Sequence, residues 1–367
     1  MKPFLVERWF AKYEFSVSYN IAESCIQPLS LPEICSIAGL DPSILLGSEP
    51  IGYVDAAGSP ELRRAIAGLY PGTTAGQVLV TSGAIEANYL LHSSLIEPGD
   101  MVICQFPAYQ QLYEVARSRG ADVRLWRLYR ENQFHPDVDD LKNLARGRVK
   151  LIVVNNPHNP TGAVLSAEEM QGVLDIARRS GAFLHVDEVY NGIFYDKPVP
   201  SARLMGADVA VTSSMSKVYG LPGARIGWVA GPEPIVQKCS ELRDYTSICP
   251  AMLSERLSLT VLRNRDAFLR RSADLASRNY AIVRDWMDKC AAIVSWAPPK
   301  GGVVCFPWYH ADTGSEAVSR RLAEEQDVLV LPGTCFEHEG HFRLGFGYRT
   351  DRLVEGLSRL ERLLYTL

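Results

Sequence analysis

Residues 213–225 of this chain read SSMSKVYGLPGAR, and they are its most informative segment. Lys217 lies among small and hydroxylic residues, a glycine-rich turn follows it, and Arg225 lies eight positions further on. Lysine is usually a solvated surface residue, but this one follows a segment that reads as a buried strand. The pattern is typical of a lysine that holds an aldehyde cofactor as a Schiff base and, once displaced, moves a proton as a general base.

Short apolar runs alternate with amphipathic, helix-like stretches such as residues 167–180. Each run is bounded by turn residues, as buried strands are. This alternation predicts an α/β fold, with a mostly parallel central sheet and helices on both of its faces. The expected strands are residues 78–81, 101–104, 123–126, 150–154, 183–186, 208–212 and 226–230.

The remainder of the chain predicts a smaller α+β domain. A long helical stretch is expected from about residue 250 to residue 290, and a last helix is expected from residue 351. Short apolar runs lie between them, at residues 302–307, 328–331 and 342–346. We therefore expect residues 45–250 to form a large cofactor-binding domain. Residues 1–44 and 251–367 would form the small domain, with the N-terminal segment lining the substrate pocket.

Composition excludes several classes of protein. The chain has 367 residues, of which 47% are hydrophobic and 22% are charged, and its net charge of −4 gives no reason to expect nucleic acid or an anionic membrane as a partner. No apolar run reaches signal-peptide or membrane-span length. The eight cysteines are scattered without a C-x-x-C pair, which favours reduced thiols in a cytoplasmic protein. Cys335, His338 and His341 fit no standard zinc spacing, so no metal site is expected.

Three further motifs follow in chain order around the lysine. NNPHNPTG spans residues 155–162, DEVY spans 187–190, and Arg343 lies in FRLGF at 342–346. Together with Lys217, they resemble the signature of fold-type I pyridoxal-phosphate (PLP) enzymes of the class I and II aminotransferase group. The resemblance covers nearly the whole chain. It implies PLP as the cofactor and an α-amino acid as the substrate.

The resemblance assigns roles around the cofactor ring. Asp187, at the end of a buried strand, would keep the ring nitrogen protonated and make the ring an electron sink, although a carboxylate there could simply cap a helix. Tyr190 and Asn159 would share the phenolic oxygen of the cofactor. Tyr109 would stack on the ring, the alternative being an ordinary core aromatic.

The phosphate cradle is expected at Ser82-Gly83-Ala84, where a strand, a glycine turn and a helix N-terminus aim backbone N–H groups at an anion. Ser214 and Arg225 would complete this cradle. There is no G-x-x-x-x-G-K-[ST] motif and no strand-linked G-x-G-x-x-G, which disfavours nucleotides.

Tyr53 resembles the family tyrosine that crosses a dimer interface to reach the phosphate in the partner's site. This role implies a homodimer with composite sites. The alternative is a loop aromatic packed on its own subunit.

The substrate would be held at two ends. Arg343 would bind the α-carboxylate bidentately, although a strand arginine is often a surface ion-pair residue. Glu7, Glu14 and Glu23 are acidic candidates for holding a cationic side chain such as a guanidinium. The alternative is that they are solvated N-terminal charges.

The nearest branch that the sequence resembles is the capreomycidine synthase-like group, through residues 157–162, 216–223, 243–246 and 300–303. The segment IAESC at 21–25 departs from that group. The first interpretation is an aminotransferase that acts on an α-amino acid through an external aldimine. The alternative is an elimination or cyclisation enzyme of specialised metabolism with an arginine-like (hydroxyarginine) substrate. A non-catalytic PLP-binding module is disfavoured by the complete set of site residues.

Overall fold

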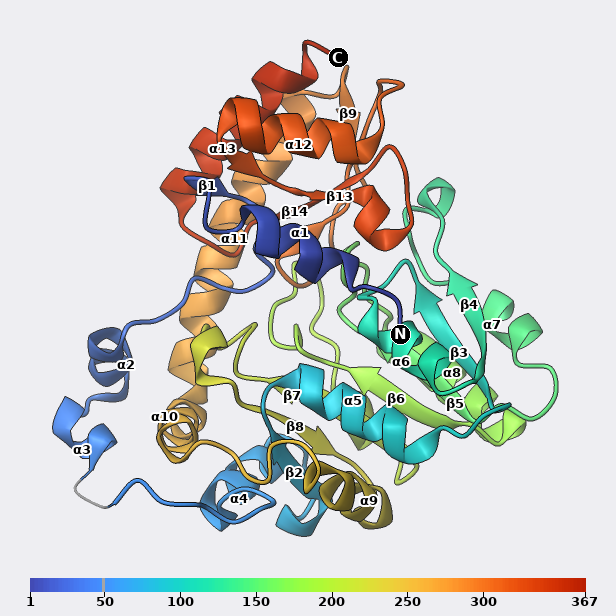
Figure 1. Cartoon of the computed structure of the whole chain (residues 1–367), viewed down its shortest axis with the longest axis vertical. Coiled ribbons are helices and arrows are strands. Elements are labelled where there is room, and N and C mark those ends of the chain that lie inside the picture. Colours follow the sequence, from blue (N-terminus) through green and yellow to red (C-terminus); the bar gives the residue numbers. More distant parts are fainter. Residues whose placement is uncertain (48–49) are drawn as a thin grey trace.

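The computed structural model describes residues 1–47 and 50–367, and its central feature is a seven-stranded sheet (Figure 1). The strand order is β2-β8-β7-β6-β5-β3-β4, and β8 alone runs antiparallel to its neighbours. The predicted mostly parallel sheet is confirmed, and each of the seven apolar runs is a strand. The strands are β2 (Val78–Thr81), β3 (Met101–Phe106), β4 (Asp122–Arg127), β5 (Leu151–Asn155), β6 (Phe183–Asp187), β7 (Val209–Ser214) and β8 (Gly227–Ala230).

Helices cover both faces of this sheet, which explains why β2, β5, β7 and β8 are buried along their whole length. Leu79 and Val153 belong to a core shared with α5 (Ala84–Leu95), α6 (Gln111–Ser118) and α9 (Glu233–Arg243). The adjacent residues Val80 and Val154 belong to a second core, which includes the buried side of α8 (Ala167–Ser180). Because successive side chains of a strand point to opposite faces, each strand contributes to both cores.

The ends of α8 show how local sequence sets the elements. Ser166 accepts a hydrogen bond from the backbone N–H of Glu169, whose side chain returns to Ser166 in a capping box. Gly181 ends the helix in the left-handed region at φ 72°. The structure therefore confirms the predicted helix over residues 167–180, with the same first and last residues.

A second group of elements lies above the sheet in Figure 1. The expected helix over 250–290 is two helices, α10 (Met252–Arg263) and α11 (Arg265–Lys289), which are separated at Asn264. The 25-residue helix α11 runs along both groups (Figure 1). The other elements here are α1 (Leu5–Tyr13), β1 (Tyr19–Asn20), β9 (Val294–Ser295), β10 (Val304–Cys305), β11 (Trp308–Tyr309), α12 (Ser315–Gln326), β12 (Val328–Leu329), β13 (Leu331–Pro332), β14 (Phe342–Gly345) and α13 (Thr350–Leu364).

The N-terminal segment is divided between the two groups. β1 pairs in parallel with β12, whereas α2 (Leu31–Ala38) and α3 (Pro42–Leu46) lie beside α10 (Figure 1). The helices α4 (Pro60–Ala67) and α7 (Val138–Leu144) complete the α-helices of the described residues. The domain boundaries expected from the sequence stay a prediction.

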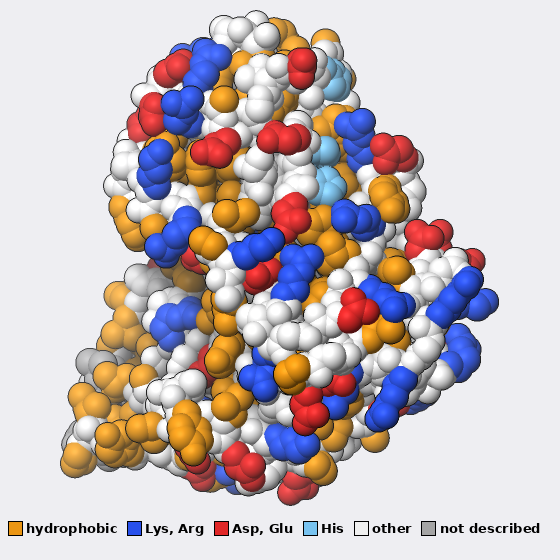
Figure 2. All heavy atoms as spheres, turned by 45° about the vertical axis from the view of Figure 1, so that its right-hand side comes forward, with side chains coloured by type: hydrophobic (Ala, Val, Ile, Leu, Met, Phe, Trp, Pro, Cys, Tyr) orange, Lys and Arg blue, Asp and Glu red, His pale blue; other side chains and the backbone are white. Residues whose placement is uncertain are grey.

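Charged side chains of both signs are interspersed over the face drawn in Figure 2. Within residues 1–47 and 50–367, no helix combines the length and the apolar character needed to cross a membrane.

Candidate active site

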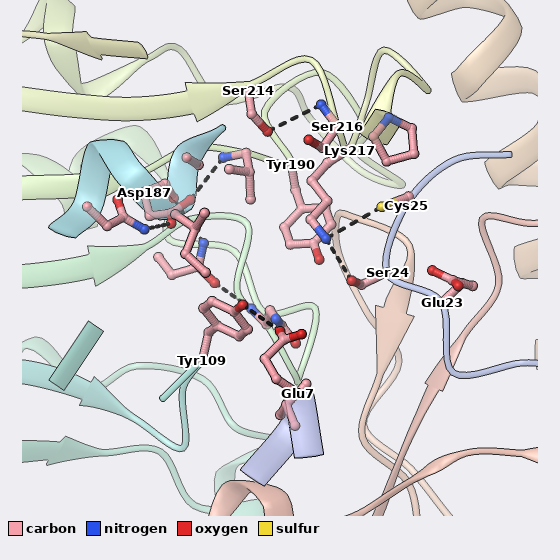
Figure 3. Close-up of a pocket in the computed structure, with 18 of the residues that line it drawn as sticks. Glu7, Glu23, Ser24, Cys25, Tyr109, Asp187, Tyr190, Ser214, Ser216 and Lys217 are labelled. Carbon is pink, nitrogen blue, oxygen red and sulfur yellow. Dashed lines mark hydrogen bonds between the residues drawn. The ribbon is translucent and has the colours of Figure 1, made fainter. Parts of the chain in front are cut away.

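A cavity of about 400 Å³ lies where the carboxyl ends of β5, β6 and β7 meet the N-terminal segment and β14 (Figure 3). In open α/β sheets this is the edge at which ligands bind. Most of the residues that the sequence singled out line this one cavity: Glu7, Glu14, Glu23, Ala84, Tyr109, Asn159, Asp187, Tyr190, Ser214, Lys217, Arg225 and Arg343.

Lys217 extends into the cavity and is held by the N-terminal segment. Its Nζ donates a hydrogen bond to Ser24 Oγ at 2.8 Å and lies 3.5 Å from Cys25 Sγ (Figure 3). The backbone N–H of Ile26 donates to the Lys217 carbonyl at 3.2 Å. Burial by itself lowers the pKa of Lys217, but the acidic groups of Cys25, Tyr190 and Glu23 outweigh it, and the pKa is raised.

Asp187 is the last residue of β6 and is 5% exposed. Its Oδ2 accepts from Asn88 Nδ2 at 2.9 Å, and its Oδ1 accepts from the backbone N–H of Val189 at 3.1 Å. Burial raises the pKa of the carboxyl, while these two hydrogen bonds oppose the shift. A protonated ring nitrogen would be the opposite charge that favours the ionised carboxylate.

The loop before α5 has the geometry of an anion cradle. Gly83 adopts φ 85° and ψ 168°, a conformation that favours glycine, and a Cβ there would lie 2.5 Å from Arg225 Nη2. Arg225 Nη2 donates to the Ser82 carbonyl at 3.2 Å, and Nη1 donates to Ser216 Oγ at 3.4 Å. Because α5 begins at Ala84, its N-terminus adds a positive dipole end beside the guanidinium.

The remaining cofactor residues lie on other walls. The hydroxyl of Tyr190 is buried and has no hydrogen-bond partner within the described chain, which suits a contact with a ligand oxygen. The hydroxyl of Tyr109 donates to Glu7 at 2.8 Å (Figure 3). Asn159 is fixed through its backbone N–H, which donates to Asn155 Oδ1 at 2.7 Å. The partnerless phenol, the glycine cradle and the buried Asp187 together fit PLP.

Arg343 is 1% exposed and has no acidic partner among the ion pairs of residues 1–47 and 50–367. Its Nη1 donates to Asn159 Oδ1 at 3.2 Å and its Nη2 donates to the Ala22 carbonyl at 2.7 Å. Its Nε is buried without a partner in the same part of the chain. Burial lowers the pKa of this guanidinium. A carboxylate ligand would supply the missing charge.

The three glutamates lie on the side of the cavity formed by α1 and the segment after β1. Glu7 accepts from Tyr109, and Glu23 accepts from Asn20 Nδ2 at 3.1 Å. The carboxylate of Glu14 makes no hydrogen bond with the described residues. Burial raises the pKa of Glu14, and the charges of Glu23 and Glu7 add to this shift. The cavity wall is therefore acidic.

Tyr53 lies outside the cavity, with 89% of its surface exposed. Asn88, Ser24 and Ser216 are site residues to which sequence reasoning gave no role. Asn88 could have been identified from its position four residues after Ala84, which puts both on one face of a helix.

The described residues contain no cluster of three or more side chains that could hold a metal ion. All eight cysteines are free thiols.

The chain was compared with known families and curated proteins. The profile of the family described as "Aminotransferase class I and II" matches residues 37–360. Capreomycidine synthase of Streptomyces vinaceus is 31% identical, with 98% of this chain and 93% of the relative covered. An aspartate aminotransferase of Pyrococcus horikoshii is 30% identical over 85% of this chain and 83% of the relative.

Two solved structures of PLP-dependent enzymes also resemble this chain. A PLP-dependent aminotransferase from Streptococcus suis superposes with a TM-score of 0.96 at 36% identity, over 100% of this chain and 98% of the other. The PLP-dependent cyclase OrfR superposes with a TM-score of 0.93 at 30% identity, again over 100% and 98% of the two chains.

Proposed function

Because this chain belongs to the class I and II aminotransferase family, whose members here are PLP-dependent enzymes, we propose that it binds PLP through Lys217 and acts on an α-amino acid as an aminotransferase. One observation carries the proposal. Lys217, Asp187 and Arg343, from distant parts of the sequence, line one cavity. A lysine, a buried carboxylate and an unpaired buried arginine are the groups that this chemistry requires.

Each part of the cofactor would be held by residues of a different chemical type. Bound PLP supplies an electron sink for negative charge that develops at the substrate Cα. Asp187 would hold the ring nitrogen, Tyr190 and Asn159 would contact the phenolic oxygen, and Tyr109 would stack on the ring. The phosphate would be held by residues of the cradle, which are Ser82, Gly83, Ala84, Ser214, Ser216 and Arg225.

The proton at the substrate Cα is moved by the Lys217 amine. Ser24, 2.8 Å from Nζ, restricts where that amine points. Arg343 binds the α-carboxylate through its Nε, which has no partner among the described residues, and so fixes the Cα–H bond relative to the lysine. The buried walls limit access of water to the reacting atoms.

The substrate class follows from the acidic wall. We infer that Glu14, with Glu7 and Glu23, holds a cationic side chain such as a guanidinium. Glu14 is the member of the set whose carboxylate has no hydrogen-bond partner among the described residues. Burial raises its pKa, and the like charges of Glu23 and Glu7 raise it further. A cation would relieve that repulsion.

The same wall supports a second candidate function. An enzyme that eliminates from or cyclises an arginine-like substrate, such as a hydroxyarginine in specialised metabolism, would need a carboxylate at this position. The 31% identity to capreomycidine synthase and the similarity to the cyclase OrfR favour this alternative.

A homodimer in the cytoplasm is part of the proposal. Tyr53, with 89% of its surface exposed, would reach the phosphate cradle of a second copy. An exposed tyrosine of this kind is typical of an interface residue.

One experiment separates the two functions. Purified protein with PLP is given arginine or 3-hydroxyarginine, each with and without 2-oxoglutarate, and products are followed by mass spectrometry. An aminotransferase yields a 2-oxo acid and glutamate. A cyclase retains the α-amino group, loses water from hydroxyarginine and ignores the 2-oxo acid. Neither product from arginine or 3-hydroxyarginine would contradict an arginine-like substrate for both functions.

A further inference from the structure

A file of buried polar side chains leads away from Asp187 into the core. Asn88 Nδ2 lies 2.9 Å from Asp187 Oδ2, and Asn88 Oδ1 lies 2.6 Å from Thr212 Oγ1. Thr212 Oγ1 lies 2.9 Å from His185 Nε2, and His185 Nδ1 lies 3.0 Å from His92 Nε2. All five side chains are at least 95% buried.

The file has a simple origin in the sequence. Ala84, Asn88 and His92 follow each other at intervals of four and lie on one face of α5. His185 and Asp187 alternate on β6 and therefore share the sheet face toward this helix. β7 places Thr212 directly beside Asp187 in the strand register. The helix whose N-terminus would hold the phosphate thus also carries the groups behind Asp187.

The hydrogen bonds of the file run in one direction. A carboxylate only accepts, so Asn88 faces Asp187 with its amide nitrogen and faces Thr212 with its carbonyl. The Thr212 hydroxyl donates its one proton to Asn88, so it accepts from His185 Nε2–H. His185 Nδ1 then accepts from His92 Nε2–H. His92 Nδ1 has no partner in the described part of the chain, so the file ends there on an acceptor.

Neutral imidazoles are required for this direction, because each ring must carry one N–H only. Burial lowers the pKa of His92 to about 4. Burial, reinforced by His92, lowers the pKa of His185 well below its ordinary value. At neutral pH both rings are therefore neutral, and each N–H or O–H that links two members of the file points toward Asp187. The second N–H of Asn88 Nδ2 faces Gln111 Oε1 at 3.4 Å.

We propose that Asn88 is a positioning residue, oriented by Thr212, His185 and His92, that keeps Asp187 an ionised acceptor facing the cofactor ring nitrogen. This inference rests on the proposed function. A reversed Asn88 would turn its carbonyl toward the carboxylate, and Asp187 would have to take up a proton to meet it. A protonated Asp187 could not hold a protonated ring nitrogen.

Two substitutions test the file. Asn88→Leu removes the donor to Asp187, and Thr212→Val removes the proton that orients Asn88 while keeping the shape of the side chain. Thr212→Ser retains the hydroxyl and is the conservative control. Ser93→Ala, on the same helix outside the file, is the matched control for the loss of a polar group.

The readout is the protonation of the ring, measured as the ¹⁵N chemical shift of ring-labelled PLP in the holoenzyme, together with the dissociation constant for PLP. The wild type is expected to show a protonated ring nitrogen. Asn88→Leu should move the shift toward neutral pyridine and weaken PLP binding roughly 10- to 100-fold, and Thr212→Val should weaken it roughly 3- to 10-fold. Both controls should match the wild type.

The outcomes separate the two proposals. A wild type that binds no PLP overturns the proposed function, and this inference with it. A wild type with a protonated ring whose shift is unchanged in Thr212→Val and Asn88→Leu overturns the positioning role alone. A merely structural role would lower the melting temperature without moving the ¹⁵N shift. If Asn88→Leu does not fold, the near-isosteric Thr212→Val decides.

Discussion

Lys217 Nζ donates to Ser24 Oγ across 2.8 Å, although 193 positions separate the two residues. The lysine is supplied by the loop after β7, and the serine by the segment after β1. The reactive amine is therefore oriented by a part of the chain that does not belong to the large sheet. This explains why the segment at 21–25 matters for the chemistry as well as for substrate binding.

The covalent attachment of the cofactor is the first prediction. Wild-type protein treated with PLP and then borohydride should gain the mass of one reduced cofactor, located by peptide mapping at Lys217. Lys217→Ala should fold, bind PLP more weakly and gain no such mass. A reducible bond that persists in Lys217→Ala would contradict the assignment. Lys300→Ala is a control lysine outside the lining of the cavity.

Removal of the Ser24 hydroxyl should slow proton transfer without preventing attachment of the cofactor. Ser24→Ala loses the hydrogen bond that orients the Lys217 amine, so exchange of the substrate Cα proton with deuterated solvent should fall about tenfold. Cys25→Ser is the comparison, because its sulfur makes only the longer 3.5 Å contact, and its rate should stay near that of the wild type. Equal rates in Ser24→Ala and the wild type would remove Ser24 from the mechanism.

Asp187→Asn should retain the fold and lose catalysis. The neutral amide no longer stabilises a protonated ring nitrogen, so Cα-proton exchange should fall by roughly two orders of magnitude or more. Circular dichroism and melting temperature serve as the check on folding. Near-normal exchange in this variant would refute the role of Asp187 as the counter-charge.

Glu14→Gln should reduce the response to cationic substrates. Arginine should perturb the cofactor absorbance at a roughly tenfold higher concentration than in the wild type, whereas the response to alanine should not change. Arginine binding to the wild type should weaken as the pH falls, because Glu14 then takes up a proton and loses its charge. Because the pKa of Glu14 is raised, this weakening should begin at a higher pH than it would with an ordinary glutamate. Glu168→Gln, an exposed carboxylate on α8, is the control. If Glu14→Gln and Glu168→Gln respond to arginine at the same concentration, Glu14 does not contribute to substrate choice.

Glu14→Gln should increase the stability of the folded protein, although it weakens arginine binding. A carboxyl whose pKa is raised in the folded state lowers the free energy of unfolding as the pH rises from the unfolded pKa to the folded pKa. The reason is that the folded protein binds more protons than the unfolded protein over that interval. Glu14→Gln should therefore raise the melting temperature at neutral pH. A lower melting temperature would show that the carboxylate has a stabilising partner.

The homodimer is tested by sedimentation and by mixing. The protein should sediment as a dimer, and Tyr53→Ala should weaken PLP binding while leaving each subunit folded. A mixture of Tyr53→Ala and Lys217→Ala subunits should regain part of the activity, because one of the two composite sites in a mixed dimer is intact. A fully active monomer would contradict the composite site.

Several site residues could be predicted from the order of motifs along the chain and from the positions at which strands end. Asp187 and Ser214 follow from the rule that ligands meet the carboxyl ends of parallel strands. Ser24 could not be assigned a role, because its contact with Lys217 joins elements 193 positions apart. Asn88 was overlooked, although it lies four residues after Ala84 on the same helix face. The break between α10 and α11 was also missed, since Asn264 interrupts an amphipathic pattern that continues on both sides of it.

The pairing of β1 with β12 has a consequence for how the protein is made. Tyr19 pairs with Val328, and the Ile21 carbonyl accepts from the backbone N–H of Gly345. On a ribosome the segment after β1 emerges before the central sheet, whereas β12 and β14 emerge after it. The segment that carries Ser24 therefore gains these partners only once the sheet has been synthesised, and we expect its position beside Lys217 to be fixed late in folding.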